Sequence, residues 1–321
     1  MRMRSLGVVT ALLCSMVALP ATAQDTPDAL PLAQGGPKPV YTPETMLRRI
    51  AGEQNAALGY WMAFAQMKEP APGALSPDLL DANAAALATL ARASRLTVCD
   101  WGIDYELGPN APIAHLPKAR ALASVNSAAA VRSMSRGQAD QAIDQWLVGM
   151  RFAAHIESGG TLISTLTAWS ALRSTWESLE PWVAERRLTA AQRARLADYI
   201  RLLPETVFKW DSAVLNEARV LQTPSALAAA KPGPGAFVPP AAADTKRFLR
   251  EIERVGDAFA RSPDQTAVVI AGYEAAVLEG MMGRETGVHR FYRESMPSLT
   301  KTNETRREVK AARERLLAAL R

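Results

Sequence analysis

Apolar residues recur three and four positions apart along most of the chain, and this spacing predicts α-helices. The segment from Ala139 to Ile156 is the clearest case, because its apolar residues would form one continuous face. The alternation of polar and apolar residues that marks a β-strand does not occur over any convincing length. We therefore predict an all-α protein of about nine to eleven helices, either an irregular helical bundle or a short α-solenoid. The predicted face consists of Ala139, Ala142, Ile143, Trp146, Leu147, Met150, Ala153 and Ala154.

Helix-start signals divide the pattern into separate helices. A capping hydroxyl precedes an apolar run at three places. These are Thr42-Pro43, Ser76-Pro77-Asp78 and the capping box from Thr189 to Gln192. On the first helix, the inward face predicted from spacing is Leu47, Ile50, Leu58, Trp61 and Ala65. The predicted helices cover about 43–65, 77–94, 118–134, 139–156, 161–182, 189–203, 204–221, 245–261, 264–282 and 302–320.

Residues 123–156 resemble one tetratricopeptide-like (TPR-like) helix pair of about 34 residues. Gly137 lies in the predicted turn, Ala142 is small enough for two helices to approach closely, and Trp146 would fill the space between them. No second unit of the chain matches, so we favour a single TPR-like hairpin within an irregular bundle over a repeat array.

The N-terminus has the pattern of a cleaved export signal. Arg2 and Arg4 precede an apolar run that is too short to span a bilayer comfortably, and Ala21-Thr22-Ala23 is a small-residue cleavage site. We predict cleavage after Ala23 and a periplasmic or secreted protein. The alternative, a lipoprotein anchored through Cys14, is less favoured because Leu13 is larger than the residue which normally precedes such a cysteine.

Pro- and Gly-rich composition predicts the domain boundaries after this 1–23 signal. Residues 24–41 read as a flexible linker and 42–222 as the main helical domain. A low-complexity run follows at 223–243, and 244–321 forms a C-terminal helical part that we expect to pack on the main domain.

Charge and cysteine content exclude several function classes. The chain has 37 basic and 32 acidic residues, and loss of Arg2 and Arg4 with the signal leaves 35 and 32, a net charge of +3. Without a basic stripe this balance gives no support to nucleic-acid binding. Cys99 would be the one remaining cysteine, so no internal disulfide is expected. We also expect no cofactor and no membrane-spanning segment after cleavage.

The stretch from Cys99 to Arg120 contains the candidate chemistry. Its glycines and prolines prevent a continuous helix, while its apolar residues could hold it against the protein body. Under the structural hypothesis, which we favour, its acidic side chains cap turns and backbone N–H groups. Under the alternative, carboxylates and histidines form a metal or acid–base centre. The candidate residues of that centre are Asp100, Asp104, Glu106, His115 and, from elsewhere in the chain, His155.

Two further features also allow two interpretations. Cys99 could be a nucleophile activated by His115 or His155, but no local signature supports this, and a lone cysteine is commonly a small apolar residue. Gly160 and Thr161 could present free N–H groups to an anion at a helix start, although an ordinary helix end followed by a threonine cap explains them without a ligand. The residues to which we assign structural roles are Cys99, Trp101, Gly137, Ala142, Trp146, Gly160 and Thr161.

Together these motifs resemble a group of uncharacterised exported bacterial proteins of helical, TPR-like design. The resemblance covers roughly residues 95–170 and implies no activity and no catalytic residue. It is carried by Cys99-Asp100-Trp101-Gly102, Gly108-Pro109-Asn110, His115-Leu116, Lys118-Ala119-Arg120, the hairpin from Gly137 to Trp146, and Gly160-Thr161-Leu162-Ile163.

Three functions follow as hypotheses. The first is an exported, non-enzymatic module that binds another exported or envelope protein or a peptide, with a groove between packed helices as its site. The second is a hydrolase or metal-dependent enzyme centred on the 99–120 loop. The third is a structural subunit of an envelope assembly, tethered by the linker that follows the signal.

Overall fold

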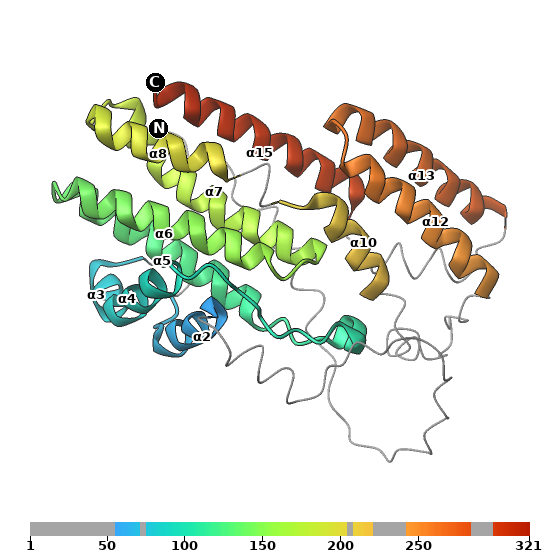
Figure 1. The fold of residues 1–321 in the computed structure, drawn as a ribbon, viewed down its shortest axis with the longest axis horizontal. Coiled ribbons are helices and arrows are strands. Elements are labelled where there is room, and N and C mark those ends of the chain that lie inside the picture. The colour runs from blue at the N-terminus through green and yellow to red at the C-terminus, as the bar shows by residue number, and fades with distance from the viewer. Residues whose placement is uncertain (1–54, 71–74, 204–207, 221–241, 284–297) are drawn as a thin grey trace, which may run out of the picture. The chain divides into compact units, whose positions relative to one another are not determined.

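The computed structural model describes residues 55–70, 75–203, 208–220, 242–283 and 298–321. The chain divides into two units, residues 1–41 and 42–321, and all described residues belong to the second. They form only helices and an isolated bridge between Asn55 and Val98, which confirms the all-α class (Figure 1). The described helices are α2 (Ala56–Gln66), α3 (Pro77–Ala82), α4 (Ala84–Ala93), the 3-10 helix η2 (Tyr105–Asn110), α5 (His115–Ser135), α6 (Ala139–Glu157), α7 (Leu162–Ala184), α8 (Ala190–Leu202), α10 (Trp210–Val220), α12 (Ala242–Phe259), α13 (Pro263–Gly283) and α15 (Leu299–Ala319).

Helices α5, α6 and α7 form the centre of this unit and contact one another pairwise (Figure 1). The predicted hairpin is present as α5 and α6, which are joined by residues 136–138. The turn is a Schellman motif, in which Gly137 has a φ of +77° and its N–H bonds to the Met134 carbonyl, while the Gln138 N–H bonds to the Ser133 carbonyl. Ala142 and Trp146 are fully buried. The pair matches the expected helix hairpin, and its TPR-like character stays a prediction.

Helices α2 and α4 pack closely together beside this centre. A Cβ atom added to Gly59 of α2 would lie 2.7 Å from the Ala93 Cβ of α4, so the glycine is what allows the approach. The prediction of one helix over 77–94 is wrong, since α3 ends and α4 begins at Asn83. The buried Asn83 side chain bonds to both the N–H and the carbonyl of Lys68, at 2.9 and 3.0 Å, and this tertiary contact occupies the break.

The inward face predicted for the first helix is also wrong where it can be compared. Leu58 and Trp61 are 45% and 39% exposed, and Ala65 is exposed as well. The opposite face is buried instead, around Tyr60 and Phe64, because it meets Trp101 and α6 through aromatic contacts. The predicted Thr42 cap, Leu47 and Ile50 lie outside the described residues.

Other helix boundaries agree with the sequence to within a few residues, with two exceptions. The prediction of one helix over 43–65 is wrong, because Asn55 has an extended backbone and caps α2, which begins at Ala56. The helix predicted from Pro204 is wrong in its start, because Lys209 is not helical and α10 begins at Trp210.

The capping box at Thr189 and Gln192 is confirmed, with both reciprocal hydrogen bonds present. Helix α5 begins at His115, three residues before the predicted start, and α7 continues through Pro181 to Ala184.

The C-terminal helices contact the main helical part. Helix α15 packs against α7 and α8, and α10 packs against α7 and α12. Arg313 of α15 donates to the backbone carbonyls of Ile200 and Arg201 at the end of α8, at 3.3 and 2.7 Å. Most of the predicted low-complexity run at 223–243 lies outside the described residues, which resume at Ala242 with α12.

Candidate functional site

Asp100 and Asp104, two of the three acidic residues in the 99–120 loop, are hydrogen-bonded to the backbone. The Asp100 carboxylate accepts a hydrogen bond from the Gly102 N–H at 2.9 Å, and the Asp104 carboxylate accepts one from the Glu106 N–H at 3.0 Å. Asn55, the cap of α2, bonds to both the N–H and the carbonyl of Asp100. This arrangement is the one expected if these carboxylates shape the loop.

Trp101 fastens the loop to the helices. Its indole N–H donates to the His155 carbonyl of α6 at 2.8 Å, and its ring stacks on His115 with 4.4 Å between centroids. His115 is 1% exposed, and its Nε2 has no hydrogen-bond partner. Burial lowers the pKa of His115 to about 4, so the imidazole is neutral near pH 7.

Neither the metal-centre hypothesis nor the hypothesis of a nucleophilic Cys99 gains support from the described residues. Among the described residues, no group of three or more His, Cys, Asp or Glu side chains could hold a metal ion. Burial raises the pKa of the Cys99 thiol to about 12, and a hydrogen bond with Ser158 only partly opposes this rise. A protonated thiol is a poor nucleophile, so this environment favours a structural role for Cys99.

The start of α7 was one of the two predicted candidates for a ligand site, as an anion-binding helix end. In the structure a glutamate side chain of the same chain is hydrogen-bonded there. Thr161 caps the helix by accepting from the Ser164 N–H at 3.3 Å. Glu217 of α10 accepts from the Leu162 N–H at 3.1 Å, and Asn216 donates to the Gly160 carbonyl at 2.9 Å. The N-terminal end of α7 thus contacts α10. A backbone N–H that could have bound an external anion is bonded to Glu217 of the same chain.

His155 of α6 is hydrogen-bonded to a buried tyrosine of α2. The buried Tyr60 hydroxyl and His155 Nδ1 are hydrogen-bonded at 2.5 Å. Burial raises the pKa of Tyr60 well above its usual value and lowers that of His155 to about 4, so the tyrosine keeps its proton and the imidazole is neutral. Tyr60 is fully buried, and His155 Nδ1 is the one acceptor that its hydroxyl meets in the described part of the chain. We therefore assign the hydroxyl as the donor and the ring hydrogen to Nε2, which makes that nitrogen a donor.

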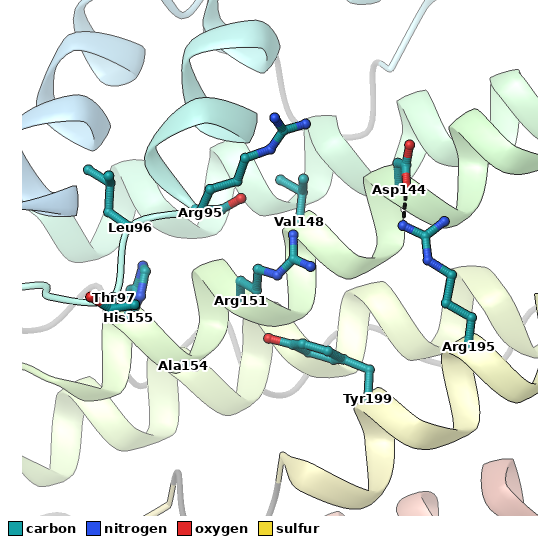
Figure 2. Close-up of a pocket in the computed structure, with 11 residues that line it drawn as sticks. Arg95, Leu96, Thr97, Asp144, Val148, Arg151, Ala154, His155, Arg195 and Tyr199 are labelled. Carbon is teal, nitrogen blue, oxygen red and sulfur yellow. Dashed lines mark hydrogen bonds and ion pairs between the residues drawn. The ribbon is translucent and has the colours of Figure 1, made fainter. Parts of the chain in front are cut away.

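A pocket of about 580 Å³ lies beside His155, between α6, α8 and the connector that follows α4 (Figure 2). This volume is within the range of known ligand pockets. On α6 the lining side chains recur every three or four residues, so they share one face of the helix. The lining consists of Ser94, Arg95, Leu96 and Thr97 from the connector, Asp144, Val148, Arg151, Ala154 and His155 from α6, and Arg195 and Tyr199 from α8.

Three arginines and one carboxylate set the charge of this pocket. Arg195 forms an ion pair with Asp144 across the gap between α8 and α6, at 2.6 Å (Figure 2). Arg95 and Arg151 pair with no carboxylate within the described part of the chain. The four charges sum to +2, so the pocket favours an anion.

Tyr199 positions one of the two unpaired arginines. The Arg151 guanidinium lies over the Tyr199 ring, with Cζ 5.4 Å from the ring centroid. A guanidinium has five N–H donors, so this contact leaves donors for a ligand. Arg151 is therefore fixed in place and still able to bind.

Of the sequence candidates, His155 alone lines the pocket. Sequence reasoning missed Arg95, Arg151, Arg195 and Tyr199, because they come from three elements that are distant along the chain. One signal was available on α6, where Asp144, Arg151 and His155 form a polar stripe beside the predicted apolar face.

Comparison of the chain with known protein families, characterised proteins and solved structures finds no match. The resemblance to exported TPR-like proteins thus stays a prediction. In the described part of the chain, every helix is too short or too polar to cross a bilayer.

Proposed function

We propose that the protein is an exported helical module that binds another protein or a peptide, and that the pocket between α6, α8 and the 94–97 connector is its binding site. The observation that carries this proposal is the pair of arginines, Arg95 and Arg151, which line a pocket without a carboxylate partner among the described residues. The internal bonds of Asp100 and Asp104 favour this binding role over an enzyme centred on the loop.

The dimensions of the site support a short extended segment as the occupant. Asp144 and His155 are eleven positions apart on α6, a distance of about 16 Å at the rise of an α-helix. An extended peptide advances about 3.3 Å per residue, so roughly five residues of a partner would lie along this face. Val148, Ala154 and Leu96 offer apolar contacts between the charged groups.

Selection from a random heptapeptide library tests the proposal. The probe is the full chain without residues 1–23, compared with Thr97→Trp, which places a large ring in the pocket from an exposed connector residue. Val268→Trp is the matched control, because Val268 is 75% exposed on α13 and does not line the pocket. We expect peptides that bind the wild type and the control and bind Thr97→Trp at least about tenfold more weakly. Selection of no binder, or equal binding to all three proteins, would overturn the proposal.

A further inference from the structure

The pocket already shows how it binds a carboxylate. Asp144 belongs to one wall and Arg195 to the opposite wall, and their side chains meet at 2.6 Å while remaining 61% and 51% exposed. Arginine binds carboxylates well because its planar guanidinium presents parallel N–H donors to the two oxygens. Asp144 therefore neutralises one of the three arginines and leaves the other two for a ligand.

The unpaired donors lie on neighbouring parts of the lining. Arg151 follows Asp144 by seven residues on the same face of α6, and His155 follows Arg151 by one further turn. The neutral His155 contributes an N–H donor without a charge, and Arg95 approaches from the connector. The lining thus contains two cationic groups and an N–H donor, a composition that favours an acceptor with negative charge.

Resting on the proposed function, we propose that the pocket recognises a carboxylate of the bound peptide, held by the Arg151 guanidinium with Arg95 and the His155 N–H beside it. The shared chemistry is the carboxylate group, and its two sources are an acidic side chain and a free peptide C-terminus. Tyr199 acts as a positioning residue, because its ring lies against the guanidinium.

Two peptide pairs distinguish the sources. The first pair is acetylated and amidated Ala-Ala-Glu-Ala-Ala against the same peptide with glutamine in place of glutamate. The second is acetylated pentaalanine as the free acid against its amide. Chemical-shift titrations to about 10 mM detect weak binding. In at least one pair, we expect the peptide with the carboxylate to bind about tenfold more tightly than its uncharged counterpart. Added salt should weaken this binding, because the site is partly exposed.

Substitutions at Arg151 assign the effect to the proposed site. Arg151→Gln should remove the preference for the acid, and Arg151→Lys should retain only part of it, because lysine keeps the charge and lacks the planar fork. Arg136→Gln is the matched control, since it makes the same charge change at an exposed residue outside the pocket lining. It should leave the preference unchanged.

The outcomes separate this inference from the proposed function. Suppose that library peptides bind through the pocket. If the two members of each peptide pair then bind equally, or if neither peptide with a carboxylate binds, carboxylate recognition is overturned and the binding role stands. If inorganic phosphate binds at Arg151 more tightly than either acid, carboxylate recognition is likewise overturned. If no library peptide binds, the proposed function fails. An acid preference that survives Arg151→Gln would place the carboxylate elsewhere and overturn the assignment.

Discussion

Gly149 of α6 lies in close contact with both α5 and α7. A Cβ atom at this position would lie 2.6 Å from Thr175 Oγ1 of α7 and 3.0 Å from Asn126 Nδ2 of α5. Thr175 and Asn126 are buried, and Asn126 is held by a hydrogen bond to the Gln145 carbonyl, so neither can move freely. The residue type at a single position thus sets the spacing of three helices.

Gly149→Ala should lower the free energy of unfolding by about 1–3 kcal/mol, because overpacking outweighs the gain in helix propensity. Gly272→Ala is the control, since Gly272 is also within a helix, α13, and a Cβ there meets nothing within 4 Å. That change should raise the free energy of unfolding by up to about 1 kcal/mol. Urea denaturation followed by circular dichroism measures both. Equal effects of the two substitutions would contradict this account of Gly149.

At the scale of elements, α7 ends in a strained conformation. Arg186 follows the helix with a φ of 52°, and the Schellman bonds run from the Arg186 N–H to the Val183 carbonyl and from the Arg187 N–H to the Trp182 carbonyl. At the end of α5, the equivalent place holds Gly137. A residue with a Cβ is disfavoured in this left-handed region, whereas glycine adopts it readily.

Arg186→Gly should therefore stabilise the protein by about 0.5–1 kcal/mol. Arg136→Gly provides the comparison, because Arg136 is an exposed arginine at a helix end with a φ of −88°. There glycine relieves no strain and should be neutral or destabilising. Thermal unfolding of the two variants beside the wild type checks the difference, and a loss of stability in Arg186→Gly would contradict the argument.

The sequence predicts elements well where the determinants are local. The Thr189–Gln192 capping box and the Gly137 turn depend on neighbouring residues, and both are present. The break at Asn83 and the inward face of α2 depend on tertiary contacts, with Lys68 and Trp101 respectively, which spacing within one helix does not contain. The pocket was missed for the same reason, since three separate elements supply its charges.

Across the whole molecule, four buried titratable groups have opposite effects on how the free energy of unfolding depends on pH. Burial raises the pKa of Glu157 and of Glu217 from 4.5 to about 7, and it lowers the pKa of His115 and of His155 from 6.5 to about 4. Between pH 4.5 and 6.5 the folded chain keeps two protons on the glutamates that the unfolded chain has released. The unfolded chain instead holds two protons on the histidines. The numbers of bound protons nearly cancel.

The contribution of these groups to stability should therefore be nearly constant between pH 4.5 and 6.5. The double variant Glu157→Gln/Glu217→Gln removes the glutamate part, which falls as pH rises, and leaves the histidine part, which rises with pH. Its free energy of unfolding should then increase by about 2 kcal/mol per pH unit across this window, relative to the wild type. Urea denaturation at several pH values measures the slope.

Glu253→Gln/Glu304→Gln is the matched control for this charge change, because both side chains are exposed. Its pH dependence should follow that of the wild type. If the buried double variant also follows the wild type, these carboxyls do not keep their protons in the folded state and the balance described above is wrong.

One wall of the pocket is a connector, residues 94–97, while the other walls are the helices α6 and α8. Lengthening or shortening a surface connector leaves the hydrogen-bonded ladders of both helices intact. Changes in the connector can therefore alter the width and chemistry of the pocket in descendants of this gene with little loss of folding stability. Substitutions that change ligand preference would arise first in that short segment.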